Sequence, residues 1–137
     1  MNPKFVKSLV IILILITIGG GITLYFLLNS KDTGGELTID QMVEFSYTTE
    51  EMRTDLKDGN FVLIQFQFIT DSKAGAEEIA KREFQVKNEF IKQSVDLTEK
   101  DFRENLAQLE DNIQVAMSKK MTEGKITDVL ITSKVIQ

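Results

Sequence analysis

The feature that most constrains this chain is an uncharged apolar run near its N-terminus, bounded by Lys7 and Lys31. An α-helix rises about 1.5 Å per residue, so a bilayer core about 30 Å thick needs about 20 apolar residues. A secretory signal has a shorter apolar core and then a small-x-small cleavage site, and no such site follows Leu28. The sequence therefore predicts an uncleaved transmembrane helix over residues 8–30.

The charges on either side of this helix predict its orientation. Lys4, Lys7 and the amino terminus precede it, whereas Lys31 beyond it is followed at once by Asp32. By the positive-inside rule, residues 1–7 stay in the cytoplasm and the rest of the chain lies outside. The exported part has 14 basic and 21 acidic residues, a net charge of −7. This acidic excess argues against nucleic acid and anionic lipid head groups as partners.

Three consecutive glycines, Gly19, Gly20 and Gly21, lie in the middle of the predicted helix. Glycine costs a soluble helix about 1 kcal/mol relative to alanine, but it is more frequent in membrane helices. Two interpretations stay open. Together with Thr17 and Thr23, the glycines form a small-residue face that lets a neighbouring helix approach closely. Alternatively, they reflect ordinary glycine usage in a membrane span.

Residues 31–40 are predicted to form a juxtamembrane linker, which begins with the polar, glycine-rich KDTGGE. Its Asp-Thr-Gly triplet also occurs in aspartic proteases, where a second aspartate faces the first. Here Lys31 precedes the triplet and the sequence holds no second copy, which argues against a protease. The remaining residues, 41–137, suffice for one small extracytoplasmic domain with one core.

The domain begins with two predicted strands. Apolar residues alternate from Val43 to Tyr47, and a looser extended stretch runs from Met52 to Leu56. Asp58-Gly59 is then a strong signal for a two-residue hairpin turn. The return strand, FVLIQFQFI, has one mixed face and one wholly apolar face that we expect in the core. The apolar face consists of Val62, Ile64, Phe66 and Phe68.

Two predicted helices follow. The first begins at Asp71 or Ser72 as its N-cap. The second begins at LTEKDF, where Thr98 and Asp101 have capping-box spacing, and we expect it to end at Gly124. Apolar residues recur with helical period in both. The first stripe consists of Ala76, Ile79, Ala80, Phe84, Val86, Phe90, Ile91 and Val95, and the second of Phe102, Leu106, Leu109, Ile113, Ala116 and Met117.

The chain closes with ITDVLITSKVI, whose β-branched residues and alternation predict a strand over 126–136. The predicted order of elements in the domain is therefore β-β-α-α-β. This order is typical of an α+β domain in which two helices pack on one face of a small antiparallel or mixed sheet.

Several kinds of chemistry are missing from the composition. The chain contains no histidine, cysteine or tryptophan, which removes soft metal ligands, thiol nucleophiles and imidazole bases. It has no glycine-rich phosphate loop. The acid pairs Glu50-Glu51 and Glu77-Glu78 are interpreted as solvated surface, because adjacent side chains on a strand or helix point apart. We therefore expect no catalytic residue, metal or cofactor, and a protein that is not an enzyme.

Two charged residues, Glu83 and Lys87, lie inside the apolar arc of the first helix and are spaced to pair. Two interpretations stay open. The pair reaches past the edge of the core to water, or this side of the helix meets another subunit or partner. The second interpretation makes an interaction face of Lys81, Arg82, Glu83, Lys87 and Asn88.

The order of anchor, linker, strand pair, KREFQVKNEFI, capped helix and GKITDVLITSKVIQ resembles the flagellar basal body-associated FliL family over the whole chain. The closing segment is the most specific part, since members resemble G-K-V-x-x-V-x-[IF]-T-x-F-[IV]-[IV]-Q there. Arg82, Glu83, Lys87 and Asn88 are similar to the polar pattern of the family's first helix, whereas Lys134 stands where an aromatic is usual. The matching positions are Gly124, Lys125, Val129, Ile131, Thr132, Val135, Ile136 and Gln137.

The resemblance implies a single-pass protein of the bacterial inner membrane, located in the flagellar basal body and serving motility and chemotaxis. It implies a ring of identical copies that associates with the ion-driven stator proteins MotA and MotB. It also implies a domain similar to the stomatin and prohibitin (SPFH) type, whose members form rings. Two other classes stay open: a membrane-anchored extracytoplasmic adaptor outside the motor, and a small enzyme that uses only carboxylates and hydroxyls.

Overall fold

The structure is a computed structural model that describes residues 2–29 and 35–137. It divides into two compact units, Met1–Glu36 and Leu37–Gln137, and each is described by itself. The predicted linker residues 31–34 lie outside the described residues.

The first unit contains helix α1, Pro3–Asn29. Proline at the first helical position has its φ angle already set for the helix and needs no N–H partner there. The helix is long and apolar enough to cross a membrane over Pro3–Tyr25, with a mean hydropathy of 2.4. It begins five residues before the predicted 8–30, and residue 30 lies outside the described part of the chain.

The second unit begins with a short helix, α2 (Ile39–Glu44), where the sequence predicts the end of a linker and the start of a strand. The predicted start of the strand at Val43 is wrong, because Thr38 and Gln41 form a capping box that begins a helix. Thr38 Oγ1 accepts the Gln41 N–H at 3.3 Å, and Gln41 Oε1 accepts the Thr38 N–H at 3.0 Å. Two satisfied backbone donors outweigh the short apolar alternation and commit this segment to a helix.

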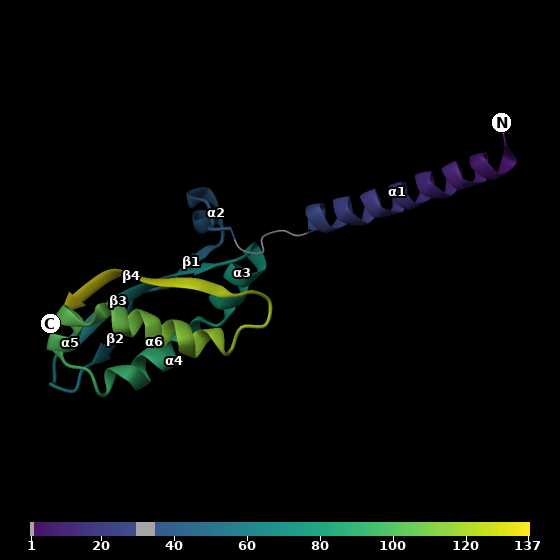
Figure 1. Ribbon diagram of the computed structural model, residues 1–137. Coiled ribbons are helices and arrows are strands. Elements are labelled where there is room, and N and C mark those ends of the chain that lie inside the picture. The colour runs from purple at the N-terminus through teal and green to yellow at the C-terminus, as the bar shows by residue number, and fades with distance from the viewer. Residues whose placement is uncertain (1, 30–34) are drawn as a thin grey trace. The chain divides into compact units, whose positions relative to one another are not determined.

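The sheet is antiparallel and has β3 (Phe61–Thr70) at its centre. Strand β4 (Ile126–Ile136) pairs with one side of β3, while β1 (Ser46–Thr48) and β2 (Met52–Asp55) follow one another along the other side (Figure 1). Between β1 and β2, Thr49 continues the ladder with its N–H, which donates to the Phe66 carbonyl at 2.8 Å. The predicted final strand, 126–136, is confirmed.

The predicted hairpin between β2 and β3 is confirmed, but its loop comprises residues 56–60 instead of two. Leu56 is buried in the core, and its N–H donates to the Asn60 carbonyl at 2.7 Å. Burial of this leucine draws the loop inward and lengthens it. Gly59 has a φ of +85°, a conformation that glycine adopts without steric cost.

Four helices cover one face of the sheet: α3 (Lys73–Lys81), α4 (Glu83–Ser94), α5 (Glu99–Glu104) and α6 (Leu106–Ser118). Each predicted helix is thus broken once, at Arg82 and at Asn105, so the element order predicted for the domain is wrong although its α+β class is confirmed. Ser72 is the N-cap of α3, and the Thr98–Asp101 capping box begins α5, both as predicted.

The prediction that the last helix ends at Gly124 is also wrong. Helix α6 ends at Ser118, and Gly124 instead lies against the start of α3. A Cβ at position 124 would lie 2.7 Å from the Gly75 Cα, which is closer than real Cβ atoms approach. Glycine is therefore required here by a close backbone approach and not by a helix end.

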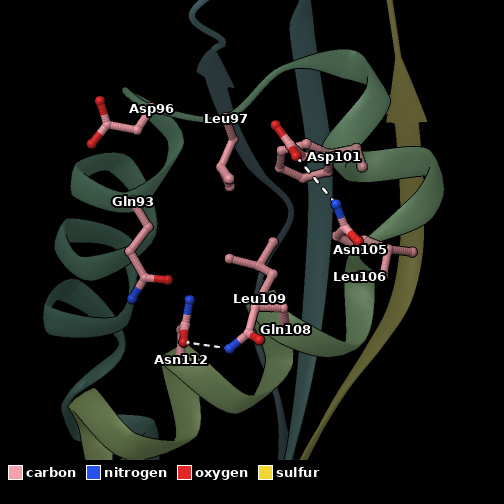
Figure 2. A pocket seen from close by; sticks show the side chains of 10 residues that line it. Gln93, Asp96, Leu97, Asp101, Asn105, Leu106, Gln108, Leu109 and Asn112 are labelled. Atoms are coloured by element: carbon pink, nitrogen blue, oxygen red, sulfur yellow. Dashed lines mark hydrogen bonds between the residues drawn. The ribbon is translucent and has the colours of Figure 1, made fainter.

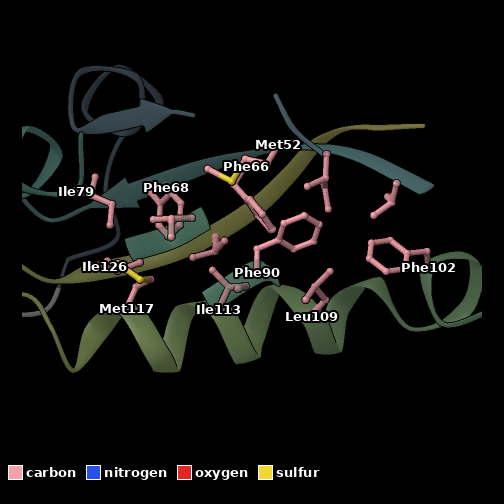
Figure 3. Close-up of a cluster of buried hydrophobic side chains, with 14 of the residues drawn as sticks. Met52, Phe66, Phe68, Ile79, Phe90, Phe102, Leu109, Ile113, Met117 and Ile126 are labelled. Atoms are coloured by element: carbon pink, nitrogen blue, oxygen red, sulfur yellow. The ribbon is translucent and has the colours of Figure 1, made fainter. Parts of the chain in front are cut away.

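The core lies between the sheet and the helices, as Figure 3 shows. The predicted face of β3, Val62, Ile64, Phe66 and Phe68, is fully buried. The Phe66 and Phe90 rings meet edge to face with centroids 5.6 Å apart, and Phe102 meets Phe90 in the same manner at 6.5 Å. Such aromatic pairs stabilise a core by about 1 kcal/mol beyond the area they bury.

Side chains of α6 also cover part of the outer edge of β4. Glu110 Oε1 accepts the Ile131 N–H at 2.8 Å, and Gln114 Nε2 donates to the Thr127 carbonyl at 3.2 Å. These bonds occupy backbone groups that would otherwise pair with a strand of another molecule. The outer edge of β4 is therefore partly blocked to strand pairing over the first half of the strand.

Candidate interaction surface on helix α4

The structure separates the predicted interaction residues into two pairs. Arg82, at the break between α3 and α4, and Glu83, at the start of α4, are half-buried and have partners within the domain. Lys87 and Asn88, one turn further along α4, are exposed. Of the four residues, only Lys87 and Asn88 are therefore exposed to a second molecule, and their role in a contact stays a prediction.

Arg82 belongs to a cluster around Glu78 that the sequence did not predict. The Arg82 Nε donates to Glu78 Oε1 at 2.8 Å, and the same carboxylate accepts the Thr122 N–H at 2.9 Å and the Glu123 N–H at 2.6 Å. Glu78 is only 7% exposed, so its interpretation as solvated surface is wrong. We call this cluster the Glu78 clamp, because it joins α3 to the turn before β4. It consists of Glu78, Arg82, Thr122, Glu123 and the adjacent Gly124.

The clamp holds Glu78 in its ionised form. Burial by itself would raise the pKa of the carboxyl, but hydrogen bonds from Glu123, Arg82 and Thr122 outweigh burial and lower its pKa to about 2. A carboxyl with so low a pKa is deprotonated near neutrality and has no proton to donate. The Glu78 clamp is therefore a structural element.

Glu83 also faces inward, and it does not pair with Lys87 as the sequence suggested. Its carboxylate accepts the Tyr47 hydroxyl of β1 and, at 3.3 Å, the Glu50 N–H. The hydrogen bond to Glu83, together with burial and the negative charge, raises the pKa of Tyr47 to about 12. Glu83 thus fastens the start of α4 to the sheet edge.

Three apolar residues predicted to lie in the core instead lie on the outer surface of α4. Phe84 is 71% exposed, Val95 is 63% exposed, and Ile91 is also exposed. They recur at about two and three helical turns, so they share one face, which Lys87 and Asn88 flank. The apolar arc in the sequence was too wide for one helix face, and only Val86 and Phe90 of α4's share are buried. We call the exposed set the α4 stripe: Phe84, Lys87, Asn88, Ile91 and Val95.

A second exposed apolar group lies on α2. Ile39 and Val43 are exposed one helical turn apart, with Asp40 and Glu44 beside them. We call these four residues the α2 face. Its charged residues are acidic, whereas the exposed charge of the α4 stripe is the cation of Lys87.

Lys134 lies on the helix-covered side of β4. Its Nζ donates to the Phe102 carbonyl in the last turn of α5 at 2.9 Å. Because the carbonyls at a helix C-terminus carry partial negative charge, a cation is favourable there. Lys134, at the position where the resemblance leads us to expect an aromatic residue, therefore makes an intramolecular contact.

The glycines of α1 have no neighbour within the described part of the chain. A Cβ built on Gly19, Gly20 or Gly21 would have nothing within 4 Å. The Thr23 hydroxyl donates to the Gly19 carbonyl at 2.8 Å, which satisfies it inside its own helix. The role of these glycines in helix packing stays a prediction.

Comparisons with known proteins identify the family of this chain. The family model described as flagellar basal body-associated protein FliL matches residues 46–137, which include the whole sheet and the α4 stripe. The flagellar protein FliL of Bacillus subtilis (strain 168) is 31% identical over 117 residues, which cover 82% of this chain and 84% of that protein. The chain therefore belongs to the flagellar basal body-associated FliL family, which gives it a role in motility.

Proposed function

We propose that this protein is a non-enzymatic component of the flagellar basal body that forms a ring in the cytoplasmic membrane and associates with the stator proteins MotA and MotB, in support of torque generation and chemotaxis. Helix α1 anchors it, with the N-terminus inside and the domain outside. The observation that carries the proposal is the α4 stripe, because an exposed apolar patch rimmed by polar residues is typical of a protein–protein contact.

The ring contact joins the α4 stripe of one copy to the α2 face of the next. A ring needs two different surfaces of the same subunit, and α2 and α4 lie on opposite sides of the domain (Figure 1). Both surfaces are apolar at their centre. Lys87 on one is opposite in charge to Asp40 and Glu44 on the other.

The test compares two double variants of the full-length chain in detergent. Phe84→Ser with Lys87→Glu removes the apolar centre and reverses the charge of the α4 stripe. Val115→Ser with Lys119→Glu makes the same changes at exposed positions on α6 and its C-cap, and is the matched control. We expect the first variant to be monomeric and the second to remain oligomeric in light scattering, with both retaining the wild-type melting temperature. Oligomers of normal size in both variants would place the contact elsewhere.

Arg82 is left unchanged in this test because reversing its charge would break the Glu78 clamp and confuse folding with assembly. A rescue experiment identifies the opposite face. If Lys87→Glu alone weakens the oligomer, Glu44→Lys should restore it, because the two exposed charges would again be opposite. Failure of the rescue would exclude α2 as the partner of the α4 stripe.

Association with the stator is tested in cells. A photo-crosslinking amino acid at Glu51, which is exposed and belongs to neither ring surface, should give products that contain MotA or MotB, and cells with the Phe84→Ser, Lys87→Glu variant should swim poorly in soft agar. Normal swimming and bead rotation without stator products would instead favour an adaptor outside the motor.

Ser118→Cys tests the orientation of the protein in the membrane, because the chain has no native cysteine. An impermeant thiol reagent should label this cysteine on intact cells once any outer membrane is permeabilised.

A further inference from the structure

A cavity of about 550 Å³ opens between the end of α4 and the α5–α6 pair, away from the α4 stripe and the Glu78 clamp. Figure 2 shows Gln93 of α4 facing Leu109 and Asn112 of α6 across it, with Leu97 pointing in from the connection between α4 and α5. Neither the family match nor the proposed ring assigns a role to this cavity.

The polar atoms around the cavity are mostly acceptors. Gln93 Oε1 is buried and has no hydrogen-bond partner among the described residues. Of the ten described residues that line the cavity, two are carboxylates, Asp96 and Asp101, and none is a lysine or arginine. A buried acceptor without a partner costs free energy, so its retention beside two carboxylates points to a ligand that donates hydrogen bonds and carries positive charge.

The cations on neighbouring turns are already engaged. Lys92 lies 3.5 Å from a Glu89 oxygen, and Lys100 lies 3.9 Å from a Glu104 oxygen. Arg103 pairs with Glu99. None of these three cations forms an ion pair with Asp96, so the Asp96 carboxylate is open to a cation from another molecule.

The remaining lining is aliphatic. Leu97 and Leu106 are partly buried against the core, and Leu109 is buried at the back of the cavity. The aromatic residue in the lining, Phe102, is 1% exposed and so offers no ring face on which a sugar could stack. The lining thus suits an aliphatic stem that ends in a cationic group.

We propose that this cavity binds an arginine side chain of a partner protein, with its methylene stem on the leucines and its guanidinium against Gln93 Oε1 and Asp96. Arginine fits better than lysine because its five N–H groups, fixed in one plane, can reach an amide oxygen and a carboxylate at once. The pKa of Asp101 is held low by hydrogen bonds from the Thr98 N–H and hydroxyl and from Asn105, so this carboxylate also stays charged near neutrality.

The test uses the full-length protein in detergent and two blocked peptides with the sequence Gly-Trp-Gly-X-Gly, where X is arginine or its neutral analogue citrulline. The protein has no tryptophan, so the anisotropy of peptide tryptophan emission reports binding directly, and empty micelles measure background. Hydrogen bonds to charged groups are worth about twice neutral ones, so we expect the arginine peptide to bind about tenfold more tightly than the citrulline peptide.

Two variants locate the site. Gln93→Leu and Asp96→Asn together should reduce this tenfold preference to nearly one, because they remove the orphan acceptor and an exposed charge. Asp111→Asn removes one negative charge from an exposed position of α6 outside the cavity and should leave the preference unchanged.

Three results would overturn the proposal. The first is equal binding of the two peptides to the wild-type protein. The second is a preference that survives in the Gln93→Leu, Asp96→Asn double variant while its melting temperature shows that it is folded. The third is binding of N,N′-diacetylchitobiose without binding of the arginine peptide, which would make this a carbohydrate site.

Discussion

The Glu78 clamp on α3 and the cavity beside Gln93 near the end of α4 differ in how far their polar atoms are satisfied by hydrogen bonds. The Glu78 carboxylate accepts hydrogen bonds from Arg82, Thr122 and Glu123. The Gln93 amide oxygen is also buried but accepts none among the described residues. The two buried oxygens therefore have different roles. An acceptor whose hydrogen bonds are all made within the domain stabilises the fold, whereas an acceptor without a partner can bind a ligand.

The largest effect we expect follows from breaking the clamp. Glu78→Gln removes the negative charge that Arg82 and two backbone N–H groups contact, and leaves the half-buried Arg82 without its charged partner. We expect the domain to lose about 3 kcal/mol of unfolding free energy, at the low end for a broken buried pair. Denaturation followed by circular dichroism measures this. Glu77→Gln, at the exposed neighbouring position, is the control and should change stability by less than about 0.5 kcal/mol.

Acid should abolish that difference. The pKa of Glu78 is about 2 in the folded domain against an ordinary value of 4.5, so its contribution is complete above about pH 4.5 and is lost as the pH falls toward 2. We therefore expect the stabilities of wild type and Glu78→Gln to converge between these pH values. A constant gap across this range would show that the clamp works through packing and not through the ionised carboxylate.

The next effect tests the close approach at the edge of the clamp. Gly124→Ala would place a Cβ 2.7 Å from the Gly75 Cα, which is a backbone atom that cannot move aside cheaply. We expect a loss of about 2 kcal/mol, typical of an overpacked site. Gly35→Ala is the matched change, because nothing lies within 4 Å of a Cβ there, and its melting temperature should equal that of wild type.

A smaller effect separates the clamp from the α4 stripe. Arg82→Gln should lower stability by about 1 kcal/mol, because it removes a charged partner of Glu78 from a side chain that is 25% exposed. Lys87→Gln should be neutral within about 0.5 kcal/mol, since Lys87 is exposed. Equal losses from the two changes would mean that Lys87 also supports the fold.

The smallest effect we expect is an increase in stability. Gln93→Leu replaces an unsatisfied buried acceptor with an apolar side chain among leucines, which should raise stability by about 0.5 kcal/mol. Thermal melting of the full-length chain at matched detergent concentration measures it. A loss of stability instead would show that Gln93 has a structural partner, for example an ordered water. Gln93 would then stabilise the fold as Glu78 does.

Much of the fold could be predicted from the sequence because the signals are local. The uncharged run predicts α1, the alternation of FVLIQFQFI predicts the buried face of β3, and spacing predicts the Thr98–Asp101 capping box. Each depends on residues within a few positions of one another. The same reasoning failed at α2, because a capping box and an apolar alternation overlap there and only the former was satisfied.

The candidate sites were only partly predictable. Arg82, Glu83, Lys87 and Asn88 do lie together on one segment, but periodicity did not show that Phe84, Ile91 and Val95 would be exposed. The width of the apolar arc did indicate that some of its residues would be exposed, because it exceeded what one helix face can bury against a small sheet.

By itself, the sequence determined the apolar helix, the α+β class, the buried face of the central strand, and the lack of histidine and cysteine chemistry. Only the tertiary structure decided that Glu78 meets the turn at Thr122, that Lys134 reaches the end of α5, and that Gln93 borders a cavity. The physical reason is the separation in sequence over which each kind of interaction acts. Periodicity and capping act within a few residues, whereas these contacts join segments far apart in the chain, whose meeting depends on how the helices break and how the core packs.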